Sequence, residues 1–263
     1  MKHFINQALA RMRADEPAIG LAIRLNRSGE IALLAKSLDY DFLFIDMQHS
    51  GISIQTALEI SLAALATGIA PLVRVAGVDN IDAPRLLDAG AMGIIFPSVN
   101  TAEEAQTAVD NCKFAPIGKR SVGGGYPHFA FATVPIGEAV QVLNNETAVV
   151  CMIETKEGLD NLDAIAAVEG VDVIHLGAND LLADLGLHGQ FDHPVVGEAV
   201  QKILAACRKH GKFAGLGGDK TPEGQSRFIR EGGRFMSTHS DYHFIAQGAG
   251  EHARKLRQAS LAR

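Results

Sequence analysis

The chain has 263 residues and a formal net charge of −6, and its 24 basic residues are scattered along the sequence. That distribution argues against nucleic acid as a partner, and no apolar run approaches the roughly 20 residues of a membrane span. With 47% hydrophobic and 21% charged residues, the composition is typical of a globular protein with one large core.

The beginning of the chain and its cysteines both favour a cytoplasmic location. The segment Met1–Arg13 is polar and carries charges where a secretory signal needs an apolar core. The three cysteines, Cys112, Cys151 and Cys207, lie far apart and form no Cys-x-x-Cys pair. We therefore expect reduced, mostly buried thiols.

Eight short apolar runs follow one another along the chain, most of them separated by a segment with helical periodicity. They predict strands at Ala18–Ile23, Phe42–Asp46, Pro71–Val75, Gly93–Phe96, Ala148–Ile153, Val173–Leu176, Phe213–Leu216 and Arg234–Thr238. Ser28 precedes a predicted helix over Gly29–Leu38, Thr101 precedes one over Ala102–Cys112, and Thr221 opens the helix after the seventh strand. Hydroxyl side chains are favoured at such positions, so these residues support the helix starts.

Eight alternating units favour a single (β/α)8 TIM barrel over residues 1–263, an α/β fold that commonly needs about 250 residues. A doubly wound open sheet is the competing architecture. It should carry Gly-x-Gly-x-x-Gly after the first strand, where Arg24-Leu25-Asn26-Arg27 stands instead. A helical tail, Asp241–Arg263, completes the expected fold and packs either on its own barrel or on a neighbouring subunit.

One long segment, Lys113–Pro135, shows no sustained periodicity and contains Pro116, the run Gly123-Gly124-Gly125 and Pro127. Loops longer than about 12 to 15 residues inside a compact domain usually have a role of their own. Because this loop comes after the fourth strand, we expect it on the face of the barrel where active sites form. We interpret it either as a lid or as a subunit contact.

Polar side chains stand at the ends of four predicted strands. Asp46 and His49 belong to the end of the second strand, Arg74 to the third, Glu154 to the fifth and Asp180 to the sixth. The carboxyl ends of all barrel strands open at one mouth, so we expect these groups to converge there. Each alone has a structural explanation as a cap or turn residue, but structural needs rarely assemble the whole set.

Glu154 and Asp180 come from adjacent strands, and two facing carboxylates would raise each other's pKa unless a cation lay between them. We therefore predict a divalent metal site formed by these two residues. Oxygen ligands completed by water suit Mg2+ or Mn2+, with Co2+ as an alternative, because no cysteine or second histidine falls nearby in the pattern. The structural alternative is a pair of ordinary helix caps.

Two further groups are candidates for binding and proton transfer. Arg74 lies inside an apolar run, so its guanidinium needs a carboxylate from the protein or a ligand, and the carboxylate of a small acid fits well. His49 can act as a base if a partner holds its tautomer, and Asp88 is a candidate for that partner. Alternatively, Asp88 merely precedes the helix stop Ala89-Gly90.

Five motifs occur together in an order that is similar to one enzyme family. They are Phe42-x-x-Ile45-Asp46-x-x-His49-Ser50, Pro71-Leu72-Val73-Arg74-Val75, Leu86-Leu87-Asp88-Ala89-Gly90-Ala91-x-Gly93-Ile94, Ile153-Glu154-Thr155 and Leu176-Gly177-x-x-Asp180-Leu181. From about Gly20 to Gly215, the chain resembles the HpcH/HpaI aldolase family. The resemblance implies a class II, metal-dependent pyruvate aldolase on a barrel of the phosphoenolpyruvate/pyruvate type, assembled as a hexamer.

The resemblance also implies roles for individual residues. Glu154 and Asp180 would bind the metal, Arg74 would hold the carboxylate and enolate oxygen of pyruvate, and His49 paired with Asp88 would transfer protons. The expected reaction cleaves or forms the bond between C3 and C4 of a 4-hydroxy-2-oxo acid. Its small-molecule partners are then a 2-oxo acid and an aldehyde.

The chain departs from the family pattern at positions that border the expected site. Gln48 replaces a glutamate, Met152 replaces a glutamine, and Ala178-Asn179 replaces Pro-Ser. Gln48 removes a negative charge beside the metal, which should favour a bound anion, and Met152 removes a hydrogen-bonding amide. We expect these four substrate-binding positions to change the substrate rather than the reaction class.

Three rival functions use the same barrel. Schiff-base chemistry needs a desolvated lysine at the mouth, but Lys156 lies past the fifth strand and Lys212 enters the seventh at its opposite end. A 2-oxo-acid decarboxylase or an acyl-thioester lyase would keep the metal and change the bond that breaks. A barrel that binds a small acid without turnover would not need the full set of His49, Arg74 and the two acidic residues.

Overall fold

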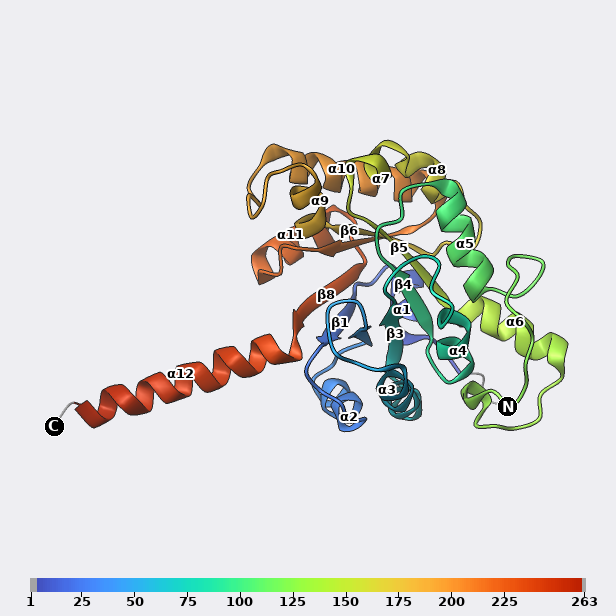
Figure 1. Ribbon diagram of the computed structural model, residues 1–263, viewed down its shortest axis with the longest axis horizontal. Coiled ribbons are helices and arrows are strands. Elements are labelled where there is room, and N and C mark those ends of the chain that lie inside the picture. The colour runs from blue at the N-terminus through green and yellow to red at the C-terminus, as the bar shows by residue number, and fades with distance from the viewer. Residues whose placement is uncertain (1–3, 262–263) are drawn as a thin grey trace.

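A computed structural model describes residues 4–261, and in it eight parallel strands close into a barrel (Figure 1). The strands are β1 (Ala18–Ile23), β2 (Phe42–Asp46), β3 (Ala70–Arg74), β4 (Gly93–Phe96), β5 (Ala148–Ile153), β6 (Val173–Gly177), β7 (Phe213–Gly217) and β8 (Phe235–Ser240). Each strand pairs with the next, and β8 pairs with β1. The predicted (β/α)8 barrel is therefore confirmed, and the open sheet is excluded.

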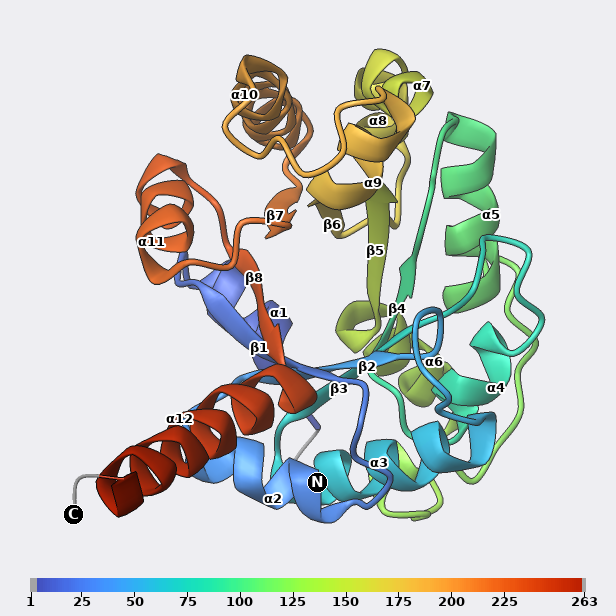
Figure 2. The same cartoon turned by 60° about the vertical axis from the view of Figure 1, so that its left-hand side comes forward.

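Helices connect the strands and cover the outside of the barrel, while α1 precedes the first strand and α12 projects away from the barrel (Figure 2). They are α1 (Gln7–Arg13), α2 (Glu30–Ser37), α3 (Ile54–Thr67), α4 (Ala83–Asp88), α5 (Ala102–Cys112), η1 (Pro127–Phe129), α6 (Ile136–Glu146), α7 (Lys156–Asp160), α8 (Leu162–Ala167), α9 (Ala178–Asp184), α10 (Pro194–His210), α11 (Pro222–Glu231) and α12 (Asp241–Leu261). Two of the three predicted caps form: the side chain of Thr101 accepts from the amide of Glu104, and that of Thr221 from the amide of Gly224. Ser28 is not the N-cap of α2, because that position is taken by Gly29 without a side-chain cap.

The strands place alternate side chains inside the barrel, because successive residues of a strand point to opposite faces. In β2, Phe42 and Phe44 point inward, and so does Asp46 at the carboxyl end. The rings of Phe42 and Phe235 stack inside the barrel with their centroids 4.5 Å apart. The barrel interior is therefore apolar toward the amino-terminal ends of the strands and polar only at the mouth. This confines the candidate chemistry to the carboxyl ends of the strands.

The segment 113–135 does not lie where the sequence analysis placed it. It follows α5 rather than β4, and α5 leads the chain back to the amino-terminal ends of the strands. There His128 approaches the carbonyl of Ala91 at 3.1 Å and its ring lies 4.9 Å from that of Phe4. The lid interpretation is wrong, because a helix returns the chain to the opposite end of the barrel before the loop begins.

The helix α12 leaves the barrel instead of packing on it (Figure 1). Only its first part contacts β1 and β8, and residues 251–260 are all exposed. Residues 1–3 of the predicted polar start and residues 262–263 of the predicted tail lie outside the described residues. The tail thus forms the predicted helix but does not cover its own barrel.

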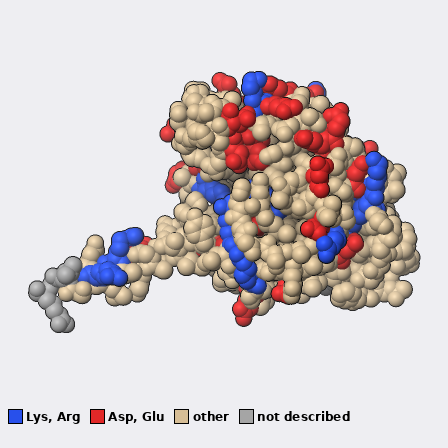
Figure 3. Space-filling view, in the orientation of Figure 1, with Lys and Arg blue, Asp and Glu red and all other residues tan. Residues whose placement is uncertain are grey.

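On the face shown in Figure 3, acidic side chains gather toward the α7 to α10 end, whereas Lys and Arg side chains are dispersed. Within residues 4–261, no helix combines the length and apolar character needed to cross a membrane. All three cysteines are unpaired and buried, as expected.

Candidate active site

A cavity of about 260 Å3 opens at the carboxyl ends of the strands, where the polar residues were predicted to converge. Four of those residues line it, Asp46, His49, Arg74 and Asp180, together with three of the predicted substrate-binding positions, Met152, Ala178 and Asn179. A larger cavity, of about 770 Å3, opens beside it at α10 and α11 and shares Ala178, Gly218 and Lys220 with it. The smaller cavity, hereafter the mouth cavity, is the candidate active site because it brings the reactive groups together.

Glu154 continues the inward alternation of β5 and is almost completely buried, with 2% of its surface exposed. One oxygen, Oε1, accepts hydrogen bonds from the amide and the hydroxyl of Ser98, at 2.7 and 2.8 Å. The backbone of Ser98 is in the left-handed region, with φ of 51°. In this conformation its amide and its hydroxyl both donate to the same oxygen of Glu154. The other oxygen, Oε2, is buried and has no hydrogen-bond partner among the described residues.

A second carboxylate and a glycine surround that oxygen. A Cβ atom on Gly177 would lie 2.3 Å from Oε2 of Glu154, so only glycine leaves room for this carboxylate. Asp180 lies one turn further on, in the first turn of α9, and lines the mouth cavity. Burial raises the pKa of Glu154, and the nearby charge of Asp180 raises it further against the Ser98 hydrogen bonds.

These features fit a divalent cation. A buried carboxylate oxygen without a partner is costly, and a cation would supply the missing interaction while separating the two negative charges. No third His, Cys, Asp or Glu joins Glu154 and Asp180 in a metal-binding group within residues 4–261. A cation held here would therefore take its remaining ligands from water and substrate, which suits Mg2+ or Mn2+ better than a structural zinc.

Arg74 finds its predicted carboxylate within the protein. Asp46 and Arg74 are register partners on β2 and β3, and both point inward. Nε of Arg74 donates to Oδ1 of Asp46 at 3.0 Å, and Nη2 donates to Oδ2 at 2.7 Å. Nη1 has only a distant contact, 4.0 Å from the sulfur of Met152, so one edge of the guanidinium still faces the cavity.

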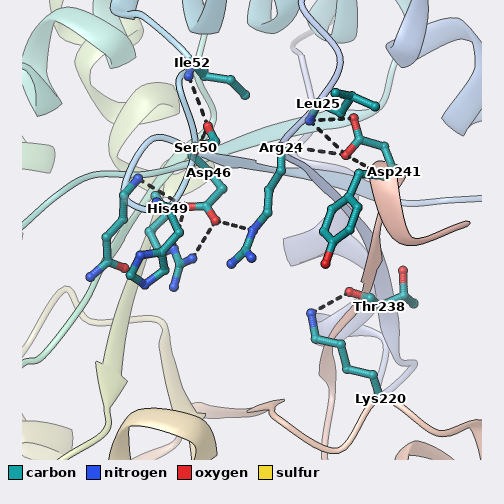
Figure 4. Close-up of polar contacts among 12 residues, drawn as sticks. Arg24, Leu25, Asp46, His49, Ser50, Ile52, Lys220, Thr238 and Asp241 are labelled. Atoms are coloured by element: carbon teal, nitrogen blue, oxygen red, sulfur yellow. Dashed lines mark hydrogen bonds and ion pairs between the residues drawn. The ribbon is translucent and has the colours of Figure 1, made fainter. Parts of the chain in front are cut away.

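Asp46 organises more than one side of the mouth. It also accepts from Nε of Arg24 at 2.7 Å and from the amides of Gln48 and His49, both at 3.1 Å. Burial opposes its ionisation, but the hydrogen bonds and charge of Arg74, the amide of His49 and the charge of Arg24 hold the pKa of Asp46 below its ordinary value. Asp46 is thus an anion that positions two arginines and the loop carrying His49 (Figure 4).

The predicted pair of His49 and Asp88 does not form in this chain. The ring of His49 is exposed and lines the mouth cavity. Asp88 ends α4, at the opposite end of the barrel, and accepts from Nη2 of Arg120 at 2.6 Å. Asp88 is the last residue of a helix that has returned to the amino-terminal ends of the strands, where the segment 113–135 also lies, so it cannot orient His49 here.

The positions that depart from the family pattern are also located. Met152, Ala178 and Asn179 line the mouth cavity, and the sulfur of Met152 lies 4.0 Å from Nη1 of Arg74. Gln48 is partly buried, and its Oε1 has no hydrogen-bond partner in the described part of the chain. The amide oxygen of Gln48 is therefore a second acceptor that lacks a donor near the mouth.

Several residues that shape the site were not predicted from the sequence. Ser98 and Asp46 were not recognised as the groups that hold Glu154 and Arg74, although a polar residue after or at the end of a strand was a usable signal. The expectation that no lysine lies at the mouth was wrong: Lys220, on the loop after β7, lines the cavity. Burial and the charges of Arg24 and Arg74 lower the pKa of Lys220 to about 8.

His175 forms part of the cavity wall and was also missed. It lies on β6 with its ring packed edge-on against Phe235, their centroids 5.4 Å apart. Burial, together with the charges of Lys220 and Arg74, lowers the pKa of His175 to about 3. The imidazole is therefore neutral at physiological pH and adds no charge to the site.

Comparison with known proteins places this geometry in a family. The family model described as HpcH/HpaI aldolase/citrate lyase matches residues 8–247. The chain is 39% identical to a 4-hydroxy-4-methyl-2-oxoglutarate aldolase of Hapsidospora irregularis over 251 residues, which cover 92% of each chain. It is 32% identical to a 4-hydroxy-2-oxo-heptane-1,7-dioate aldolase of Escherichia coli over 244 residues, 93% of this chain and 92% of that one. A crystal structure of an HpcH/HpaI aldolase from Desulfitobacterium hafniense superposes with a TM-score of 0.87, at 27% identity and 95% coverage of both chains.

Proposed function

The chain belongs to the HpcH/HpaI aldolase/citrate lyase family, and we propose that its mouth cavity is the active site of a metal-dependent aldolase acting on 4-hydroxy-2-oxo acids. It is a carbon–carbon lyase, and its relatives named as 4-hydroxy-2-oxo acid aldolases support that substrate class. The observation that carries the site assignment is the buried, unpartnered Oε2 of Glu154 beside Asp180.

In this proposal Glu154 and Asp180 hold the divalent cation, Mg2+ or Mn2+, with Co2+ as an alternative. When bound, the cation polarises the 2-oxo group of the substrate and stabilises negative charge on its oxygen. Ser98 keeps Oε1 of Glu154 occupied, so Oε2 is the oxygen available to the ion. One oxygen held by Ser98 and the other left without a partner together support a ligand role for Glu154.

The reaction itself relies on Arg74 and His49. Nη1 of Arg74 is the donor that Asp46 leaves available, so it would bind the carboxylate of the 2-oxo acid and the oxygen that becomes the enolate. His49 would accept the proton of the 4-hydroxyl group while the C3–C4 bond breaks and its electron pair passes to the pyruvate fragment. An aldehyde leaves, and protonation at C3 of the enolate completes pyruvate; addition is the reverse.

One experiment tests the proposed chemistry directly. Pyruvate is incubated with the protein in D2O and a divalent ion, with and without EDTA, and its methyl protons are followed by NMR. We expect exchange that depends on the ion, because formation of the enolate releases a methyl proton. Absence of exchange with Mg2+, Mn2+ and Co2+, together with absence of pyruvate release from a 4-hydroxy-2-oxo acid, would contradict the proposed function.

The glycine beside Glu154 provides a second test. We expect Gly177→Ala to weaken divalent-ion affinity by about 10- to 100-fold, because the added methyl group would displace Oε2 of Glu154. The measurement is the ion concentration that gives half-maximal activity. Gly137→Ala in α6 is the matched control, since a Cβ there meets no heavy atom within 4 Å. Equal ion affinity in both variants would argue against Glu154 as a ligand.

We also propose that the protein is a homo-oligomer, and by family resemblance a hexamer. The projecting helix α12 exposes large apolar side chains, and so do β1 and α2 on the barrel. These residues are Tyr242, Phe244, Ile245 and Leu256 on α12, and Ile19, Leu33, Leu34 and Leu38 on the barrel. Apolar surfaces of this kind mark sites of protein contact, and the helix of a second copy would cover them.

Assembly can be tested on α12 itself. We expect Ile245→Asp to reduce the mass measured by light scattering toward that of smaller species, because the substitution would place a charge in an apolar interface. Gln247→Asp on the same helix is the control and should keep the wild-type mass. The proposal fails if the wild-type protein is a monomer at micromolar concentration.

We further propose a single-domain organisation and a cytoplasmic location for the protein. The chain is organised as one catalytic domain over residues 1–263, of which the family model spans 8–247. Its location is cytoplasmic, which three unpaired and buried cysteines support. Its partners are small molecules, a 2-oxo acid and an aldehyde, and further copies of itself.

A further inference from the structure

The mouth cavity contains two cationic side chains that the proposed cleavage does not use. Arg24 follows β1 and Lys220 lies on the loop after β7, and both line the cavity. Neither occurs in the motifs that carry the family resemblance. Cationic groups in a partly closed cavity cost free energy unless an anion accompanies them, so their presence requires an explanation.

Arg24 is held at the mouth by two carboxylates. Its amide donates to Oδ1 of Asp241 at 2.9 Å, and its Nε donates to Oδ2 of Asp46 at 2.7 Å. Its two terminal nitrogens have no hydrogen bond within residues 4–261. The guanidinium is thus anchored through Nε and presents its remaining donors for a further acceptor.

Lys220 approaches from the other side. Its amino group donates to the carbonyl of Thr238 at 2.9 Å and forms no ion pair with a carboxylate in the described chain. Figure 4 shows the side chain directed from the loop after β7 back toward the region that contains Arg24 and Asp46. Arg24, Arg74 and Lys220 all line the same cavity, so the three cations lie close together. Burial and repulsion from the two arginines accordingly lower the pKa of Lys220.

The charges in the cavity do not balance. Asp46 is hydrogen-bonded to both Arg24 and Arg74, and Lys220 adds a third positive charge. The other acidic residues, Glu154 and Asp180, are assigned to a dication that would offset them. The carboxylate of the 2-oxo acid accounts for one excess positive charge, and a second anion is needed for the other.

We propose that Arg24 and Lys220 are the residues that bind the second carboxylate of a short 4-hydroxy-2-oxo diacid, the one carried by the released carbonyl fragment, and that they make the enzyme select diacids over monoacids. This inference rests on the proposed function. Arg24 and Arg74 both lie 2.7 Å from the same oxygen of Asp46, so the two carboxylate sites are close together. That proximity, in a cavity of about 260 Å3, favours a carboxylate attached at C4 or one carbon beyond it.

The test compares two acceptors of similar size in aldol addition. The full-length protein with Mg2+ or Mn2+ is given pyruvate and either glyoxylate, which carries a carboxylate, or glycolaldehyde, which does not. We expect the wild type to prefer glyoxylate in kcat/KM by about tenfold or more, since charge-assisted hydrogen bonds are made only to its carboxylate. Arg24→Met and Lys220→Met should each lower that preference by about tenfold, mainly through the KM for glyoxylate.

Two further variants separate charge from packing. Lys220→Arg keeps the positive charge and should keep most of the preference for glyoxylate. Lys156→Met is the matched control, because Lys156 also follows a strand on this face but is exposed and paired with Asp160. An equal loss in Lys220→Arg and Lys220→Met would overturn the proposal, as would an unchanged preference in Lys220→Met.

The outcomes also distinguish this inference from the proposed function. Ion-dependent exchange of the pyruvate methyl protons in the wild type, without a preference for glyoxylate, would refute the second-carboxylate site and leave the aldolase standing. Absence of exchange and of aldol addition would refute both. Borohydride treatment with pyruvate provides the last check: a stable adduct on Lys220 would show that this lysine forms an imine and would overturn its role in binding carboxylate.

Discussion

Replacing Glu154 by glutamine is expected to lower kcat/KM for cleavage of a 4-hydroxy-2-oxo acid by roughly a thousandfold or more. The buried Oε2 of Glu154 has no partner in the protein and is the oxygen proposed to hold the cation. Glutamine keeps the size of the side chain but removes the negative charge. The loss should therefore arise from the chemistry and from ion binding, and not from a disturbed fold.

The measurement combines kinetics with thermal melting. A bound ion stabilises the folded state, so Mn2+ or Mg2+ should raise the Tm of the wild type with increasing concentration. The Glu154→Gln variant should show little of this rise. Glu157→Gln, at an exposed position in α7, is the control and should respond as the wild type does. A Glu154→Gln variant that keeps both its activity and its Tm response would remove the basis of the metal site.

Replacing Asp46 by asparagine should cause the largest loss of stability, by about 3–5 kcal/mol of unfolding free energy. Asp46 is fully buried and accepts hydrogen bonds from both Arg74 and Arg24. Without its charge, the guanidinium of Arg74 stays buried at 5% exposure with no carboxylate hydrogen-bonded to it. Activity should fall as well, because Arg74 loses the partner that orients it toward the substrate.

The pH dependence of that loss has a definite sign. The pKa of Asp46 lies below its ordinary value of 3.8 in the folded protein, so its ionised form stabilises the fold above that value. The stabilisation is lost as pH falls through the lowered pKa. The difference in unfolding free energy between wild type and Asp46→Asn should therefore be constant from about pH 5 to 8 and should narrow below about pH 4.

Chemical denaturation at several pH values measures this difference. Asp79→Asn, at an exposed position, should match the wild type throughout. A difference that stays constant down to about pH 2 would mean that the charge of Asp46 is not the source of the stabilisation. No difference at any pH would mean that the hydrogen bonds to Arg74 and Arg24 contribute nothing to folding.

Site residues could be predicted from the sequence when they lie on a strand or directly at its carboxyl end. Arg74 and Glu154 follow the inward alternation of β3 and β5, and all eight strands carry their carboxyl ends to one mouth. Asp180 follows the end of β6 for the same reason. Local periodicity and the closure of the barrel are together sufficient to bring these residues to one cavity.

Residues at or beyond the end of a helix were placed incorrectly. Asp88 and the segment 113–135 follow strands in the sequence, but α4 and α5 first return the chain to the amino-terminal ends of those strands. The hydrogen bond between Arg120 and Asp88 also joins two segments that are distant in the sequence, and no local pattern predicts it. A residue at the end of a strand lies at the mouth of the barrel, whereas a residue at the end of the following helix lies at the opposite end. Order along the chain alone does not distinguish the two.

By itself, the sequence determined the closed eight-stranded fold, the strand boundaries to within a few residues and the polar ends of four strands, because each depends on short-range periodicity. Only the tertiary structure decided which charges meet. The fork between Asp46 and Arg74, the oxygen of Glu154 left without a partner, and Lys220 facing Arg24 all depend on side chains from different strands. Their interactions act over a few ångströms in space, and such distances are fixed only when the barrel closes.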